Sequence, residues 1–165
     1  MRPRTLGAVA ALAVLIADQA SKFWVLYGLG MADHERIPVA PFLDFELLWN
    51  PGISFSLFPQ GTATGRWILL ALTLAATALL AGWLWRVNGR LAGLALGAIV
   101  GGALGNGHDR FAYNAVIDFL DFHAFGYHFY VFNIADSAIT VGVALLLYDS
   151  LAVGRRALPS PGPGG

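Results

Sequence analysis

The feature that most constrains this chain is an uncharged run of residues from Trp67 to Trp85. Its length matches the roughly 20 residues that an α-helix needs to cross a bilayer. Tryptophans at both ends suit the two membrane interfaces. Across its 165 residues the chain is 57% hydrophobic and 12% charged, which is too apolar for an ordinary soluble domain. The sequence therefore predicts a polytopic membrane protein.

Three further segments are candidate spans. A second uncharged stretch covers about residues 91–108, and a third apolar stretch covers about 131–153 although it contains Asn133, Asp136 and Asp149. The N-terminal candidate, about residues 6–28, is apolar from Leu6 to Ala17 and again after Lys22. Its first part, preceded by arginines, also has the pattern of a cleavable signal peptide. Both interpretations of this segment stay open, and the other three spans are the same under either.

The arginines predict the orientation of these spans. They lie in pairs at the N-terminus, in the middle loop and near the C-terminus: Arg2 and Arg4, Arg86 and Arg90, Arg155 and Arg156. Basic residues next to spans favour the cytoplasmic side. Residues 31–65 and 109–130 would then lie outside, and nine of the ten acidic residues fall in or near that outer half. We expect any chemistry to face outward.

These observations predict an all-α membrane protein of four transmembrane helices, at about 6–28, 67–85, 91–108 and 131–153. Residues 31–65 mix polar, aromatic and proline residues, and we expect a small extracytoplasmic, strand-rich cap there. A short periplasmic segment would join the third and fourth helices. The prediction is one domain over residues 1–158, followed by a disordered proline- and glycine-rich tail at 159–165.

The third span carries glycines every four residues, at Gly93, Gly97, Gly101 and Gly105. Small residues at this spacing form a ridge that lets a neighbouring helix approach closely. Tight packing is the expected role of the glycines themselves. The ridge would also bring Asn106 and Asp109, just beyond it, close to whichever helix packs there.

Asp136 is the most informative ionisable residue, because a carboxylate within a span costs about 2.5 to 3.5 kcal/mol to insert. It lies near the outer end of the fourth span, one helical turn after Asn133. A simple role as a helix N-cap is one explanation. The other is hydrolysis by an aspartic mechanism, which needs a second carboxylate sharing a proton with the first.

Three aspartates precede Asp136 and could be that partner. Asp109 is followed by Arg110, and a close cation would favour an ionised carboxylate in a structural ion pair. Asp118 is flanked by apolar residues, which should raise its pKa toward the range useful for acid–base chemistry. Asp121 has a similar apolar setting. The residues alone favour Asp118 without excluding Asp121.

Five short strings occur in order along the chain: ADQASK at 17–22, NPGISF at 50–55, GGALGNGHDR at 101–110, VIDF at 116–119 and FNIADS at 132–137. Together they resemble the bacterial lipoprotein signal peptidase family, also called signal peptidase II. Two positions depart from the family pattern. Ser54 stands where a small apolar residue is usual, and His108 stands where an aliphatic residue is usual.

The resemblance implies an aspartyl endopeptidase that removes signal peptides from prolipoproteins by cleaving before a cysteine bearing a diacylglyceryl group. It assigns the catalytic pair to Asp118 and Asp136. It also implies supporting or substrate-binding roles for Asn50, Asn106, Asp109, Arg110, Asn133, Asp18 and Lys22. An intrahelical ion pair explains Asp18 and Lys22 equally well, since they are four residues apart.

The same resemblance implies a protein of the bacterial inner membrane with both termini in the cytoplasm. Its partners would be prolipoproteins and membrane lipids, with no nucleic acid, and the protein would be a monomer. We expect no cofactor and no metal, and the absence of cysteine excludes thiolate zinc and iron–sulfur sites.

Three other functions fit parts of the sequence. A proton-coupled transporter would use Asp136, although repeated halves and broken helices are not visible. A metal hydrolase would recruit His108, Asp109, His123 and His128, although no HExxH spacing is present. A structural membrane subunit would need neither Asp118 nor Asp136.

Overall fold

A computed structural model describes residues 1–52 and 63–157 of the chain. It contains four long helices: α1 (Pro3–Phe23), α2 (Ala63–Leu84), α3 (Arg90–Tyr113) and α4 (Ile134–Ala157). A π-helical turn, η1 (Trp24–Gly28), continues α1. Each of the four helices is long and apolar enough to cross a membrane, which confirms the four predicted apolar helices. Residues 53–62, which include Ser54, and the tail lie outside the described residues, and so do the expectations stated for them.

Two of the differences between the helix bounds and the predicted spans lie near the site. α3 continues to Tyr113, five residues beyond the predicted end, and α4 begins at Ile134 rather than near residue 131. The longer α3 carries Asp109 and Arg110 on a helix rather than in a loop. Hydropathy alone misses this extension because the added turn is polar.

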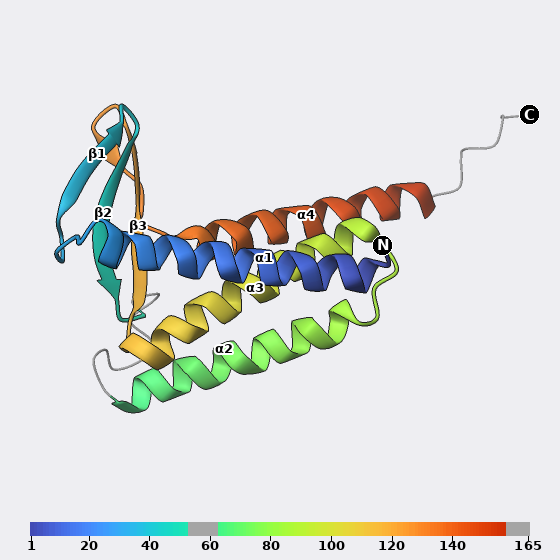
Figure 1. Cartoon of the computed structure of the whole chain (residues 1–165). Helices are drawn as coiled ribbons and strands as arrows, with labels where there is room; N and C mark the ends of the chain where they lie inside the picture. Colours follow the sequence, from blue (N-terminus) through green and yellow to red (C-terminus); the bar gives the residue numbers. More distant parts are fainter. Residues whose placement is uncertain (53–62, 158–165) are drawn as a thin grey trace, which may run out of the picture.

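Four short strands form an antiparallel sheet in the order β1 (Arg36–Ala40), β2 (Leu43–Asn50), β3 (Val116–Ala124) and β4 (Tyr127–His128). β1 and β2 lie in the segment predicted to be strand-rich, whereas β3 and β4 come from the segment between α3 and α4. In Figure 1 the sheet covers one end of the helix bundle, and the start of α1 and the end of α4 lie at the other end.

α3 is the central helix of the bundle. In its apolar window 67% of the residues are buried, against 17% or less in the other three spans. Its glycines account for this burial: a side chain at Gly97 would collide with the backbone of Gly7 on α1, and one at Gly102 with the backbone of Ala135 on α4. The close approach predicted for the glycine ridge therefore occurs at α1, and Gly102, which is not part of that ridge, allows a second close approach at α4.

A small apolar core fixes the sheet onto the end of α1. It contains Val25 of η1, Met31, Leu47 of β2, and Ile117 and Phe119 of β3, each 6% exposed or less. Because β2 and β3 are neighbours in the sheet, this core holds the polar side chains of both strands against the helix ends.

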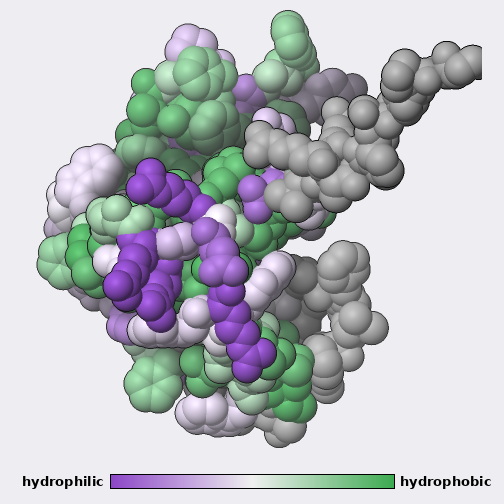
Figure 2. All heavy atoms as spheres, turned by 90° about the vertical axis from the view of Figure 1, so that its right-hand side faces the viewer, coloured by the Kyte–Doolittle hydropathy of each residue, from purple (hydrophilic) through white to green (hydrophobic). Residues whose placement is uncertain are grey.

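The end of the bundle opposite the sheet carries exposed hydrophilic side chains. Figure 2 shows hydrophilic side chains gathered at the end that carries the N-terminus and the α2–α3 connection, with apolar surface around them. The arginines of this end, Arg2, Arg4, Arg86 and Arg90, are all exposed. A hydrophilic end ringed by apolar surface is the pattern of a helix bundle whose ends reach water.

Candidate active site

Asp118 and Asp136 come together where the sheet meets the start of α4. Asp118 lies in β3 with its side chain 1% exposed, and Asp136 lies in the first turn of α4, partly exposed. The start of α4 is closed by a reciprocal pair of hydrogen bonds. The Asp136 backbone N–H donates to Asn133 Oδ1 at 2.9 Å, and the Asn133 N–H donates to Asp136 Oδ2 at 3.3 Å. This is the geometry of a capping box, so the capping role considered for Asp136 is present.

Asn133 also joins Asp136 to Asp118. While its backbone and side-chain oxygen hold Asp136, its Nδ2 donates to Asp118 Oδ1 at 2.7 Å. Asn133 is fully buried; its side-chain amide is held against the Asp118 carboxylate while its backbone N–H holds the Asp136 carboxylate. Asp118 of β3 and Asp136 of α4 therefore both contact Asn133, although 18 positions separate them in the sequence.

Two further amides hold the carboxylates from other elements. Asn50, at the end of β2, donates to Asp118 Oδ2 at 2.9 Å, and Asn106 of α3 donates to Asp136 Oδ1 at 2.8 Å. Each carboxylate thus has a hydrogen-bond donor on both of its oxygens. Such donors fix the positions of the carboxylates and stabilise their ionised forms.

A buried ion cluster stands behind Asn106. Lys22 of α1, 2% exposed, lies 2.7 Å from Asp18 and 2.7 Å from Asp109, and it donates to Asn106 Oδ1 at 3.2 Å. Asn133 Nδ2 donates to the same oxygen at 3.1 Å. With two donors on its oxygen, the Asn106 amide is oriented so that its nitrogen faces Asp136. The intrahelical pair of Asp18 with Lys22 exists, and Lys22 also ties α1 to α3.

The ion partner of Asp109 differs from the one that its neighbour in sequence suggested. Lys22, and not Arg110, makes the ion pair with Asp109. Consecutive residues of an α-helix do not face each other, so adjacency in sequence was misleading. Arg110 instead donates to the backbone oxygen of Asn106 and lies close enough to Asp136 and Asp118 to interact with them electrostatically.

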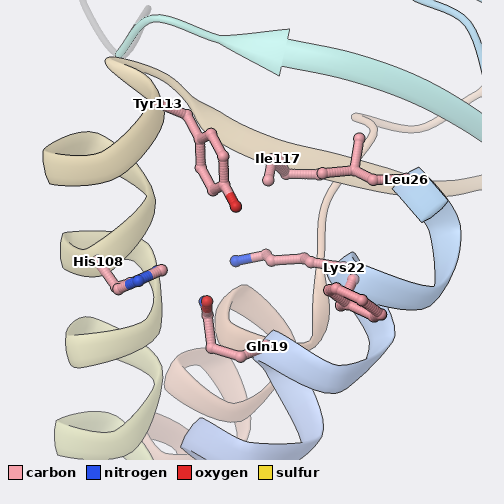
Figure 3. A pocket seen from close by; sticks show the side chains of 7 residues that line it. Gln19, Lys22, Leu26, His108, Tyr113 and Ile117 are labelled. Carbon is pink, nitrogen blue, oxygen red and sulfur yellow. The ribbon is translucent and has the colours of Figure 1, made fainter.

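Gln19 and a cavity next to Lys22 were not foreseen from the sequence. Gln19 Nε2 donates to Asp109 Oδ1 at 3.0 Å and to Asp18 Oδ2 at 3.1 Å, so it joins the same cluster. A cavity of about 210 Å³ opens between α1 and α3 beside these side chains. In Figure 3 Lys22 reaches into this space, with Gln19, His108 and Tyr113 around it. The position of Gln19 between Asp18 and Lys22 in ADQASK was the available signal.

Asp121 lies apart from this group of residues. It is buried in β3 and lies 3.2 Å from Arg36 and 2.8 Å from His128. Because side chains alternate along a strand, residues three apart point to opposite faces of the sheet. Asp118 and Asp121 therefore have different surroundings, and only Asp118 contacts Asn133.

The surroundings of Asp118 change its acidity. The pKa of its carboxyl is raised from the ordinary 3.8 to about 6. Burial is the largest cause and the nearby charge of Asp136 adds to it, whereas the hydrogen bonds from Asn50 and Asn133 and the charge of Lys22 oppose these effects. A carboxyl group with such a pKa can carry a proton near neutral pH. That property suits an acid–base group.

The histidines do not form a metal centre within residues 1–52 and 63–157, where no group of three or more candidate ligands converges. His123 lies 3.3 Å from Asp44 and His128 pairs with Asp121, both on the sheet, while His108 lies on α3. The donors named for a metal hydrolase are thus divided among three elements, α3, β3 and β4.

The fold and the site define a membrane-spanning protein that places a pair of aspartates, joined through one asparagine, where a small sheet meets its helix bundle. Residues 10–152 match the family model described as signal peptidase (SPase) II. Two proteins named lipoprotein signal peptidase are similar over almost their whole length. One, from Beijerinckia indica, is 50% identical over 98% of this chain and 96% of its own; one from Methylocella silvestris is 52% identical over 95% and 92%.

The chain therefore belongs to the signal peptidase II family, which makes it a protease. Two solved structures, each described as a bacterial membrane enzyme, have the same fold. The first has a TM-score of 0.76 at 28% identity, covering 95% of this chain and 94% of the other; the second has 0.72 at 31% identity, covering 88% and 92%. Family and helices together identify a multi-pass protein of the bacterial inner membrane.

Proposed function

We propose that this protein is an aspartic endopeptidase that removes signal peptides from prolipoproteins, with Asp118 and Asp136 as its catalytic pair. The observation that carries the proposal is the double contact of Asn133, which binds Asp118 through its amide nitrogen and Asp136 through its backbone. An aspartic hydrolase needs two carboxylates that share one proton, and this contact brings two together. The relatives named lipoprotein signal peptidase support the substrate.

The resting proton belongs on Asp118. That residue is buried and its pKa is raised to about 6, whereas Asp136 is partly exposed at a helix N-terminus, where negative charge is favoured. Asp136 would take a proton from water as the water oxygen attacks the scissile carbonyl carbon, while the protonated Asp118 polarises the carbonyl oxygen. As the tetrahedral intermediate forms, the proton of Asp118 passes to the former carbonyl oxygen. When the intermediate collapses, the C–N bond breaks, the proton on Asp136 passes to the leaving amine, and a hydroxyl of the intermediate returns a proton to Asp118 as the carboxylic acid product forms.

The other polar residues would support this pair. Asn50, Asn106 and Asn133 fix the carboxylates, and Lys22 with Asp18 and Asp109 fixes Asn106. Arg110 would balance the negative charge that the pair and the intermediate share. These steps use groups of the chain and water alone.

The substrate that the resemblance implies carries a diacylglyceryl group on the cysteine that follows the cleaved bond. Its acyl chains can remain in the bilayer while the extended peptide reaches the catalytic pair at the helix ends. The arginines favour cytoplasmic termini, which puts the pair at the outer face of the membrane. The protein would act as a monomer with membrane lipids around it.

The test is cleavage by the purified protein of two prolipoprotein peptides that differ only in the diacylglyceryl group. We expect mass spectrometry to show a single cut before the lipid-bearing cysteine, and little cleavage of the unmodified peptide. Equal cleavage of both peptides would contradict the proposed substrate. Flux of protons or solutes in proteoliposomes without any cleavage would favour a transporter instead.

A further inference from the structure

The hairpin between β3 and β4 exposes an unusual set of aromatic side chains. We define its aromatic tip as Phe125, Tyr127, Phe129 and Tyr130, whose exposed fractions are 101%, 79%, 65% and 89%. They are as exposed as Leu79 of the α2 span, at 76%. Neither the catalytic pair nor the core of the sheet uses them.

The turn that carries Phe125 is conformationally costly. Ala124 pairs with Tyr127, so Phe125 and Gly126 form a two-residue turn, and both have positive φ, 51° and 80°. Asn, Asp or Gly is favoured at the first of these positions, because a bulky side chain is disfavoured in the left-handed region. Phe125 accepts this cost and, being fully exposed, recovers no packing energy within the protein. A contact outside the chain is the physical explanation.

The position of the tip identifies what it contacts. In Figure 1 the strands run across the helix axes, and the sheet reaches sideways beyond α4. Because the four helices cross the membrane along their axes, strands running across those axes lie along the membrane surface. Tyr130 precedes the start of α4 by four residues, so extended chain places it within about 14 Å of that helix end. The tip is thus held close to the membrane interface, beside the bundle.

The chemistry of the tip fits that location. Tyrosine and phenylalanine combine apolar rings with, in tyrosine, a polar group, and such side chains are favoured at the boundary between lipid headgroups and acyl chains. α1 and η1 expose aromatic side chains near the same end of the bundle: Phe23, Trp24 and Tyr27. We propose that the aromatic tip inserts into the interface of the outer leaflet and anchors the sheet to the lipid surface.

The experiment uses the absence of native cysteine, which allows single labels on the full chain. Nitroxide labels are placed at Phe125→Cys, or separately at Tyr130→Cys, with the protein in lipid nanodiscs. Collisions with oxygen, which concentrates in lipid, are compared with collisions with a water-soluble nickel chelate. Controls are Leu79→Cys in a span and Asp33→Cys, an exposed charged position next to the sheet.

We expect both tip labels to favour oxygen several-fold over the nickel chelate, as the Leu79 label does, and the Asp33 label to show the opposite ratio. Replacing Tyr127, Phe129 and Tyr130 by Ser should shift the label at Phe125→Cys toward the nickel chelate. Tip labels with the accessibility of Asp33 would overturn the proposal. So would spin–spin broadening that disappears on dilution with unlabelled protein, because the tip would then contact a second copy.

Discussion

At the scale of single residues, the site depends on amides that fix two carboxylates with different surroundings. Asn50 donates to Asp118 and stabilises its ionised form, while burial favours the protonated form. We expect kcat/KM for the lipid-modified peptide to fall as pH rises through the upper apparent pKa of the pair, because the shared proton is then lost. Asn50→Ala removes one donor to the ionised carboxylate and should move this alkaline limb to higher pH. Asp33→Asn is the control and should leave the alkaline limb where it is. A shift of that limb to lower pH in Asn50→Ala would contradict the role of Asn50 as a donor to the ionised Asp118.

Lys22 supports a second prediction at this scale. Replacing it by Met leaves Asp18 and Asp109 buried without their cation, which should lower the free energy of unfolding by about 3 to 5 kcal/mol. The exposed Arg90 offers a matched control, and Arg90→Met should change stability by about 0.5 kcal/mol or less. Thermal unfolding in detergent measures both. Equal losses in the two variants would show that the buried cluster has no special structural role.

The sequence predicted many of the residues of the site but few of the contacts between them. Asp136 and Asp118 stood out because carboxylates in apolar surroundings are costly, and the structure places both on Asn133. The ion partner that the sequence suggested for Asp109, its neighbour Arg110, was wrong. The partner is Lys22, which lies 87 residues away in the sequence and on another helix. Contacts between distant segments depend on how helices pack, and no local pattern encodes them.

At the scale of elements, α1 and α3 pack through glycines. Gly97→Ala would place a methyl group against the backbone of Gly7, so we expect a loss of about 1 to 3 kcal/mol in the free energy of unfolding. Gly82→Ala in α2 meets open space and should be neutral or stabilising, by about 1 kcal/mol at most. Unfolding of the two variants side by side measures the difference. Similar stability in both would show that the two helices can separate without cost.

The elements were predicted unevenly. Four helices followed from apolar runs, and the glycine spacing in the third predicted its close packing, which Gly93, Gly97 and Gly101 confirm. β3 was missed because both of its faces are largely buried and two aspartates interrupt its apolar run, so the alternation typical of a strand is absent. The last turn of α3 was missed because polar residues end the apolar run there.

At the scale of the whole molecule, the bundle has two different ends. The exposed arginines lie at the end where α1 begins and α4 ends, and the sheet and the carboxylate pair lie at the other. We expect a fluorescent protein fused to the C-terminus to fluoresce in cells, and alkaline phosphatase fused at the same point to be inactive, because the paired arginines favour the cytoplasm for that end. Active phosphatase and a dark fluorescent protein would reverse the orientation and put the carboxylate pair inside.

The assignment of Asp118 and Asp136 as the catalytic pair is tested most directly by measuring cleavage of the lipid-modified peptide by three variants at matched folded amounts. Asp118→Asn and Asp136→Asn keep the shape of the side chain but cannot share a proton, and we expect each to lose at least about 1,000-fold in kcat/KM. Asp121→Asn, on the other face of β3, should cleave within a few-fold of the unaltered protein. Loss in Asp121→Asn with activity retained in Asp118→Asn would contradict the proposed pair.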